Sequence, residues 1–441
     1  MSLRQELRAV RTLAGPAIAM QLGDMALGVV DTLMVARIGP HALAAATLGN
    51  VYEALALFSV AGILMGIDPL VSQAHGAGVG RRAGLALQHA LVLGALLTPI
   101  VIALFGAAGD LFVALGQQPD VAARGGLYVW VQAPSVPFFF GFVALRHYLL
   151  GREILAPTLS VILLANLVNI FANWVLIFGN LGAPALGLIG AGISTGVVRI
   201  ALFGGLGGWV LIAGLHRSAW PGWGRRAFAP RRLARVLALG LPISLQFVLE
   251  IGAFSAATLI AGWLGVVPLA AHALVLNMAS VTFMISLGIS LAAATRAGNL
   301  KGAGEGARVL RSANVAMSLG AGLMSIAGLV FALFPEALAR LYTDDPGVVA
   351  VCVVLLPIAG AFQIFDGVQT VAGGVLRGLG KTRPAAWANF AAYWLIGLPV
   401  GYFLALHTAA GIGGLWWSLA GGLAIVAVVL GVQARREAAR A

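Results

Sequence analysis

The sequence predicts an all-α polytopic membrane protein with 12 transmembrane helices arranged as two pseudo-symmetric six-helix bundles. Hydrophobic residues make up 60% of the 441 residues and charged residues 10%, whereas soluble proteins carry about 25% charged residues. The first half of the chain is also repeated 226 positions later. The matching positions are Pro16 and Pro242, Gly39 and Gly265, Leu43–Ala45 and Leu269–Ala271, and Gly76–Gly78 and Gly302–Gly304. Repeated blocks of spans are typical of secondary transporters.

Apolar runs of about 20 residues are long enough to cross a bilayer as helices. We predict spans at 12–36, 43–68, 84–108, 121–146, 155–178, 186–214, 234–262, 269–295, 309–334, 347–376, 384–406 and 410–432. Pro134 and Pro137 fall inside the fourth span, and Pro357 and Gly360 inside the tenth. Helix bundles tolerate such kinks where neighbouring helices satisfy the freed backbone groups.

The distribution of basic residues orients these spans. All but four of the 27 Lys and Arg residues lie in the two tails and near the loops that follow even-numbered spans. The positive-inside rule therefore places both termini in the cytoplasm. We predict an N-terminal six-helix lobe at 1–214, a cytoplasmic inter-lobe loop at 215–233 and a C-terminal six-helix lobe at 234–441. Both lobes then have the same orientation, related by an axis along the membrane normal.

The topology also accounts for the net charge of +12, so we expect membrane lipids and no nucleic acid as partners. The glycine-rich loops lack the pattern of a phosphate-binding loop. The sequence shows no Cys/His metal cluster and no Ser-His-Asp arrangement. We therefore predict a protein that is not an enzyme and needs no cofactor.

Six of the 15 acidic residues fall inside the predicted spans or at a span end: Asp24, Asp31, Glu53, Asp68, Glu250 and Asp366. A carboxylate at the bilayer centre costs about 2.5–3.5 kcal/mol on the mildest scale, so such residues indicate function by default. Glu250 and Asp366 lie deep in the seventh and tenth spans, where a single site could use both. We predict that they carry the coupling ion, either H⁺ or Na⁺, and the alternative is a structural hydrogen-bonded pair.

Asp31, near the outer end of the first span, is a third predicted coupling residue. Asp24 lies seven residues earlier, on the same helix face. We expect an ion-pair network in which Arg199, inside the sixth span, contacts Asp24 or Glu53. A proton relay and a purely structural role are equally open for Asp24 and Glu53. Asp68, at a span end, is expected to be solvated.

Five uncharged residues in the fifth, seventh and tenth spans are predicted to line a substrate cavity: Asn169, Asn173, Phe362, Gln363 and Gln246. Asn169 and Asn173 are four residues apart and share a face of the fifth span. Their amides could orient an acid or line a cavity, or they could bond neighbouring helices, which is the common use of such residues.

Several short motifs are spread along the chain, namely Gly28–Met34, Pro69–Gln73 with Gly76–Gly78, Ala270–His272, Phe283-Met284, Leu376–Gly378, Gly240–Pro242 before Glu250, Val368-Gln369 after Asp366, and the segments at Asn169 and Asn173. Together they resemble the motifs of the multidrug and toxic compound extrusion (MATE) family, most closely its NorM-like bacterial branch. The resemblance runs over the whole chain. It implies two six-helix lobes and roles for Asp31, Glu250 and Asp366 in drug export driven by Na⁺ or H⁺.

On this basis we expect a multi-pass protein of the bacterial inner membrane, working as a monomer. The expected function is cation-coupled antiport that exports drug-like amphipathic organic cations by alternating access. The alternative is a dedicated exporter of an endogenous metabolite or lipid-linked precursor.

Two departures from the branch bear on the coupling ion. Phe362 stands where the branch usually has a Tyr, which removes a possible Na⁺ ligand at the Glu250–Asp366 site. Charged residues also stand where the branch more often has uncharged ones, namely Asp24, Glu53, Asp68 and Arg199. The extra carboxylates favour proton coupling or a mixed mechanism.

Overall fold

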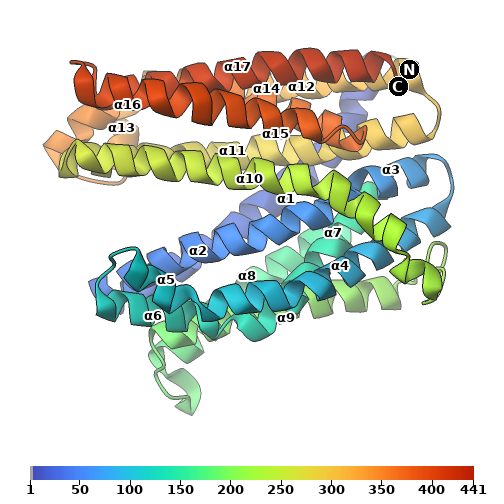
Figure 1. Ribbon diagram of the computed structural model, residues 1–441, viewed down its shortest axis with the longest axis horizontal. Coiled ribbons are helices and arrows are strands. Elements are labelled where there is room, and N and C mark those ends of the chain that lie inside the picture. The colour runs from blue at the N-terminus through green and yellow to red at the C-terminus, as the bar shows by residue number, and fades with distance from the viewer. Residues whose placement is uncertain (1–2) are drawn as a thin grey trace. The chain divides into compact units, whose positions relative to one another are not determined.

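A computed structural model describes residues 3–441, and every regular element within this range is a helix. The model contains 12 helical segments that are long and apolar enough to cross a bilayer. This confirms the predicted all-α membrane fold and the number of its spans. The helices are labelled in Figure 1.

The chain divides into two compact units. The first unit is Gly23–Ser244, and the second unit combines the chain up to Leu22 with Leu245–Ala441. Both divisions fall within long helices, α1 (Leu3–Ala36) and α10 (Pro230–Trp263). These boundaries differ from the predicted ones at 214 and 234 because they follow the packing of helix segments, whereas the prediction followed the loops.

The first unit contains the second part of α1, the first part of α10, and all elements between them. These are α2 (Pro40–Leu64), η1 (Met65–Ile67), α3 (Asp68–Gly76), α4 (Gly80–Gly106), α5 (Ala108–Ala114), α6 (Pro119–Trp130), η2 (Ala133–Ser135), α7 (Val136–Gly151), α8 (Ala156–Phe178), η3 (Asn180–Gly182), α9 (Leu188–Ile212) and η4 (Arg225–Phe228). Within it α8 packs on α9, and α7 packs on both α4 and α9.

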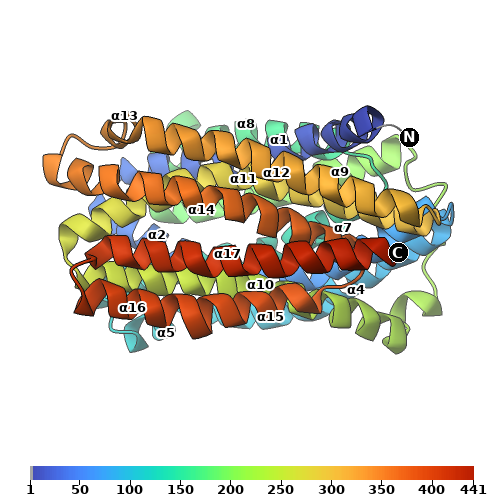
Figure 2. The ribbon, with the colours of Figure 1, turned by 90° about the horizontal axis from the view of Figure 1, so that it is seen from above.

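The second unit contains the first part of α1, the second part of α10, and the remaining helices. These are α11 (Val266–Gly302), α12 (Gly306–Leu333), α13 (Pro335–Arg340), α14 (Pro346–Gly378), α15 (Arg383–Asn389), the π-helix η5 (Phe390–Gly397), α16 (Leu398–His407) and α17 (Gly411–Ala439). Helix α14 is the centre of this unit because it packs against α11, α12 and α17, which run beside it in Figure 2.

Backbone geometry explains the glycines of the repeat. Gly39 precedes α2 with a φ of 126°, and its counterpart Gly265 precedes α11 with a φ of 119°. Gly78 and its counterpart Gly304 have φ of 70° and 75° in the turns before α4 and α12. Residues with a Cβ rarely adopt positive φ, so both copies of the repeat keep glycine at these turns.

A second repeated feature fixes where α1 and α10 pack. A Cβ on Gly62 of α2 would lie 2.5 Å from the Ser244 Cα, and a Cβ on Gly288 of α11 would lie 2.6 Å from the Ile18 Cα. The two pairs are related by the same shift of 226 positions. Because glycine allows the two backbones to approach this closely, the first part of α10 packs into the first unit and the first part of α1 into the second.

The prolines predicted to lie inside spans affect the helices differently. Pro134 lies in the short η2 segment that separates α6 from α7 in the fourth span. Helix α14 instead runs unbroken through Pro357. Next to this proline, Gly360 faces Gly328 of α12 so closely that a Cβ on Gly360 would lie 2.5 Å from the Gly328 carbonyl oxygen. The π-helix in the eleventh span was not predicted.

The inter-lobe segment is partly helical and is attached to the first unit. It contains η4, and α10 begins at Pro230. The Gln88 side chain of α4 donates a hydrogen bond to the Gly222 carbonyl at 2.8 Å, and His89 Nε2 lies 3.0 Å from the Arg226 carbonyl. These contacts fix the segment against α4.

Candidate functional site: two clusters of intramembrane acids

The first cluster lies in the first unit around Asp31 of α1. Its Oδ1 accepts hydrogen bonds from the Asn169 amide at 2.8 Å and the Asn173 amide at 2.6 Å, both from α8. The Thr195 hydroxyl of α9 lies 3.4 Å from Asp31 Oδ2. These bonds hold the acid and at the same time join α8 to α1, so both of these alternatives for the two asparagines stay open. Both side chains are buried, so these bonds are shielded from water.

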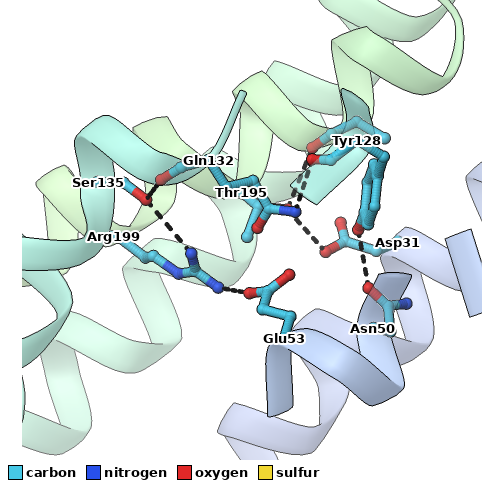
Figure 3. A network of polar contacts seen from close by, with 9 residues as sticks. Asp31, Asn50, Glu53, Tyr128, Gln132, Ser135, Thr195 and Arg199 are labelled. Carbon is cyan, nitrogen blue, oxygen red and sulfur yellow. Dashed lines mark hydrogen bonds and ion pairs between the residues drawn. The ribbon is translucent and has the colours of Figure 1, made fainter. Parts of the chain in front are cut away.

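Glu53 of α2 and Arg199 of α9 form an ion pair beside Asp31, as Figure 3 shows. Both side chains are 9% exposed. The guanidinium also donates to the Ser135 hydroxyl at 3.3 Å and acts electrostatically on Asp31. The predicted network therefore forms through Glu53. Because a buried charge must be compensated, this pair holds the Glu53 carboxylate and Arg199 together between α2 and α9.

Tyr128 of α6 extends this cluster, and the sequence analysis did not include it. Its hydroxyl donates to Asn50 Oδ1 at 2.9 Å, and its ring lies near Asp31 (Figure 3). The Gln132 amide donates to the Tyr128 carbonyl at 3.1 Å, and the Ser135 hydroxyl donates to the Gln132 carbonyl at 2.6 Å. Hydrogen bonds through Gln132 and Ser135 thus connect the Tyr128 backbone to Arg199.

The other two acids of the first unit have their own partners. Asp24 pairs with Arg146 of α7, so it does not contact Arg199. Asp68 is 6% exposed, and its Oδ1 lies 2.7 Å from Nδ1 of the buried His147. The expectation that Asp68 is solvated is therefore wrong. The second span continues through α3 to Gly76, so Asp68 lies within the helix bundle instead of at its end.

The second cluster lies in the second unit, where α10 and α14 bring Glu250 and Asp366 together. Asp366 is 3% exposed and accepts hydrogen bonds from the Gln369 amide at 3.1 Å and the Thr370 hydroxyl at 3.4 Å. The Gln369 side chain and the charge of Asp366 also act electrostatically on the half-buried Glu250. In the described part of the chain, neither acid is paired with an arginine or lysine.

Tyr393 of the π-helix lies next to this pair. Its hydroxyl is fully buried, has no hydrogen-bond partner among residues 3–441, and is within electrostatic reach of both Glu250 and Asp366. The Oε1 atom of Gln369 is likewise buried without a partner in that range. Two carboxyl groups and two uncommitted polar groups can therefore bind a proton or a small hard cation, because such cations take oxygen ligands.

The remaining predicted cavity residues lie close to this cluster along α10 and α14. Phe362 is 5% exposed and packs against Phe254 and Trp416, with ring centroids 6.1 and 6.2 Å apart. The buried Gln363 donates to the Thr282 hydroxyl of α11 at 2.6 Å. Gln246 is half-buried. Phe362 and Gln363 thus belong to the packed interior of the second unit in this conformation.

The sequence analysis identified the buried acids but missed several of the residues that surround them. Gln369 follows Asp366 by three residues and so shares its helix face, a spacing that could have identified it. Arg146 stands at the end of the predicted fourth span, where it contributes to the basic charge that orients the chain, and the sequence analysis gives it no partner. Tyr393 gives no comparable signal, because it stands in an apolar run whose π-helical geometry the sequence does not reveal.

Comparisons with known proteins agree with this architecture. The MatE family model matches residues 16–175 and 242–403, so its two copies begin at the two repeated prolines. The chain is 34% identical to the probable multidrug resistance protein NorM of Mesorhizobium japonicum, covering 97% of this chain and 93% of that protein. It is 36% identical to the multidrug resistance protein NorM of Burkholderia vietnamiensis, covering 95% and 91%.

Solved structures show the same fold. The eukaryotic MATE transporter AtDTX14 superimposes with a TM-score of 0.90 at 23% identity, covering 99% of both chains. A MOP superfamily transporter from Pyrococcus furiosus gives 0.87 at 19% identity, covering 98% of this chain and 96% of that one. The family model covers more than half of the sequence, and the bacterial relatives match almost all of it. The chain therefore belongs to the MatE family and is a multi-pass membrane transporter.

Proposed function

We propose that this transporter is a cation-coupled multidrug antiporter, which exports amphipathic organic cations in exchange for H⁺ or Na⁺. Its MatE membership and its relatives named multidrug resistance protein NorM support this proposal. The observation that carries it is the Glu250–Asp366 pair. Two acids lie within electrostatic reach of each other on bilayer-crossing helices of the second unit, and among residues 3–441 neither is paired with an arginine or lysine. An intramembrane acid without a fixed cationic partner is suited to bind a mobile cation.

Coupling follows from competition for these two carboxyl groups. Loading H⁺ or Na⁺ neutralises the pair and weakens its attraction for a cationic drug, so drug and coupling ion need not be bound together. Protonation of Asp366 also weakens the hydrogen bonds that it accepts from Gln369 and Thr370. All three residues lie on α14, and the charge of Asp366 acts on Glu250 of α10. Ion loading therefore changes the electrostatic interaction between α10 and α14, and alternating access requires such a change in state.

The choice between H⁺ and Na⁺ depends on the oxygen ligands near the pair. Phe362 supplies none, but the Gln369 Oε1 and the Tyr393 hydroxyl are buried without partners in the described chain. The Thr370 hydroxyl is a third neutral oxygen beside Asp366. These groups provide a ligand set for Na⁺, whereas H⁺ needs only the carboxyl groups.

We further propose that the protein acts as a monomer in the bacterial inner membrane with both termini in the cytoplasm. The excess of Arg and Lys near one set of loops supports this orientation. Each chain already contains both units of the fold, so no second copy is needed to complete it.

The test is efflux of a fluorescent organic cation from proteoliposomes under an imposed pH gradient or an imposed Na⁺ gradient. Efflux with one gradient identifies the coupling ion, and efflux with both identifies a mixed mechanism. If neither gradient drives efflux of any drug-like cation, the proposal fails and a dedicated exporter of another substrate replaces it. Counterflow of labelled substrate distinguishes a carrier from a passive channel in the same vesicles.

A further inference from the structure

A groove away from both acid clusters lies on the surface of the second unit, where α1 meets α12. It is an open groove with a volume of about 670 Å³. Four aliphatic side chains form much of its wall, namely Leu7, Leu310, Val315 and Leu319. Arg311 and Asn314 also line the groove, on the face of α12 that carries these aliphatic residues.

The polar part of the groove carries more than one positive charge. The Arg435 Nε of α17 donates to the Asn314 Oδ1 at 3.1 Å, which places a second guanidinium beside the groove. On α1, Arg4 and Arg11 lie three residues before and four residues after Leu7 and therefore share its helix face. Both are exposed. The groove thus combines an apolar wall with a strongly basic surround.

The acidic residues in this region are engaged elsewhere. Glu6 is fully buried and bonds Arg296 at 3.0 Å, and it also pairs with Arg308. Glu305 pairs with Arg308 as well. Glu437 of α17 pairs with Lys381 at 3.2 Å. Each of these three acids therefore already has a basic partner. Arg4, Arg11, Arg311 and Arg435 give the groove and its surround an excess of basic side chains.

We propose that this groove binds an anionic phospholipid, with the phosphate at Arg311 and Arg435 and an acyl chain along Leu7, Leu310 and Leu319. Guanidinium groups bind phosphate oxygens through paired, charge-assisted hydrogen bonds. The aliphatic wall matches an acyl chain, and basic pockets between membrane helices are suited to anionic headgroups. An organic cation is the wrong occupant, because the arginines repel it. The groove is a lipid site separate from the acid clusters.

The experiment uses the purified full-length protein in detergent, equilibrated with equal amounts of phosphatidylglycerol and phosphatidylethanolamine. Bound lipid is counted by native mass spectrometry. We expect the wild type to retain phosphatidylglycerol selectively. The double variant Arg311→Gln/Arg435→Gln should lose at least about tenfold in retention, because it removes two charge-assisted bonds. The matched control Arg124→Gln/Arg340→Gln makes the same charge change at two exposed ion pairs and should retain the lipid.

A third variant tests the apolar wall without changing charge. Ala307→Trp fills the groove, of which Ala307 is a lining residue, and should also reduce retention. If that variant does not fold, the arginine pair still decides the question. Equal retention of the two lipids by the wild type, or equal retention by the double variant and its control, overturns the proposal. Displacement of the lipid by glycerol phosphate at similar concentration would mean a phosphate site without lipid specificity and would also overturn it.

Discussion

The two acid clusters differ in what balances their charge. In the first unit, Glu53 pairs with Arg199 and Asp24 with Arg146, while Asp31 is bonded by two amides and lies near Arg199. In the second unit, the Gln369 amide donates to Asp366, and the charge of Asp366 acts on Glu250. Neither acid has a cationic side chain as partner in the described chain. Both sets of acids lie on helices that are long and apolar enough to cross a bilayer.

The difference teaches that burial of an acid in a membrane helix does not by itself identify an ion-coupling site. An arginine partner compensates the charge of the carboxylate permanently, so the carboxylate has little affinity left for a mobile cation. A carboxyl group with neutral partners gains charge compensation each time H⁺ or Na⁺ arrives. We therefore interpret Glu53 and Arg199 as structural and the Glu250–Asp366 pair as the coupling site, with Asp31 between these two cases.

The largest expected effect is on coupling in the second unit. The double variant Glu250→Gln/Asp366→Asn removes both titratable groups while keeping similar side-chain volumes. Efflux of a fluorescent cation from proteoliposomes should fall to the level of protein-free vesicles under either gradient. Each single variant should lower the rate by about 5–150-fold, the range that typical coupling free energies of 1–3 kcal/mol produce.

The control for this variant neutralises two acids that lie outside the clusters. Asp120 and Glu336 are exposed and pair with arginines four residues away. Asp120→Asn/Glu336→Gln should leave efflux close to that of the wild type. Normal gradient-driven efflux by the Glu250→Gln/Asp366→Asn protein would show that this pair is not the coupling site and would contradict the distinction between the two clusters.

The next largest effect is on the stability of the first unit. Arg199→Gln leaves Glu53 as a buried charge without its cation, which should lower the free energy of unfolding by about 3–5 kcal/mol. The double variant Glu53→Gln/Arg199→Gln removes both charges and should recover most of this loss. Thermal unfolding in detergent measures both. In the exposed pair Asp120–Arg124, loss of the cation should cost at most about 1 kcal/mol.

The two variants of the buried pair also separate structure from coupling. If the double variant is stable and retains efflux, Glu53 is dispensable for coupling and the structural interpretation holds. A stable double variant that has lost gradient-driven efflux would place Glu53 in a proton relay, and the contrast between the units would break down.

Much of the fold could be predicted because its signals lie along single helices. Apolar length predicts the spans, and the repeat predicts two similar halves. The repeated glycines match turns with positive φ in both copies. A single site that uses Glu250 and Asp366 is predicted because both acids fall deep in spans of the same half, and in the structure the charge of Asp366 acts on Glu250.

The parts that were not predicted depend on which helices are neighbours. Asp68 stands before a proline at an apparent span end, but α3 continues the span and His147 of α7 reaches the acid. Arg146 pairs with Asp24 although the two are 122 positions apart. Periodicity along one helix gives the direction of a side chain relative to its own axis and not the residue it meets across the bundle.

A smaller effect concerns Asp31, the intermediate case. Asn173→Ala removes a hydrogen bond of 2.6 Å to Asp31, and Asn169→Ala removes one of 2.8 Å. Each should lower stability by about 1.5–3 kcal/mol, since hydrogen bonds to charged groups are worth that much. Asn180→Ala, which removes an exposed bond to the Trp174 carbonyl, is the matched control and should cost less. A loss of only about 0.5–1.5 kcal/mol in both variants, the range for bonds between neutral groups, would show that Asp31 is neutral in the resting protein.

The smallest expected effect compares two buried tyrosines, one from each cluster. The Tyr128 hydroxyl donates to Asn50 at 2.9 Å, whereas that of Tyr393 has no partner among the residues described. Tyr128→Phe should therefore cost about 1 kcal/mol, while Tyr393→Phe should leave the thermal unfolding temperature unchanged or raise it, because removing an unsatisfied buried group relieves a desolvation penalty.

Transport assays complete this comparison, because a hydroxyl without a structural partner is available to the coupling ion. Under a Na⁺ gradient, Tyr393→Phe should raise the Na⁺ concentration needed for half-maximal efflux, while Tyr128→Phe should not. If Tyr393→Phe instead destabilises the protein as much as Tyr128→Phe and leaves the Na⁺ dependence unchanged, its hydroxyl is held by a bound water. The polar groups around Glu250 and Asp366 would then form a fixed network like that around Asp31, and the two clusters would differ only in their arginines.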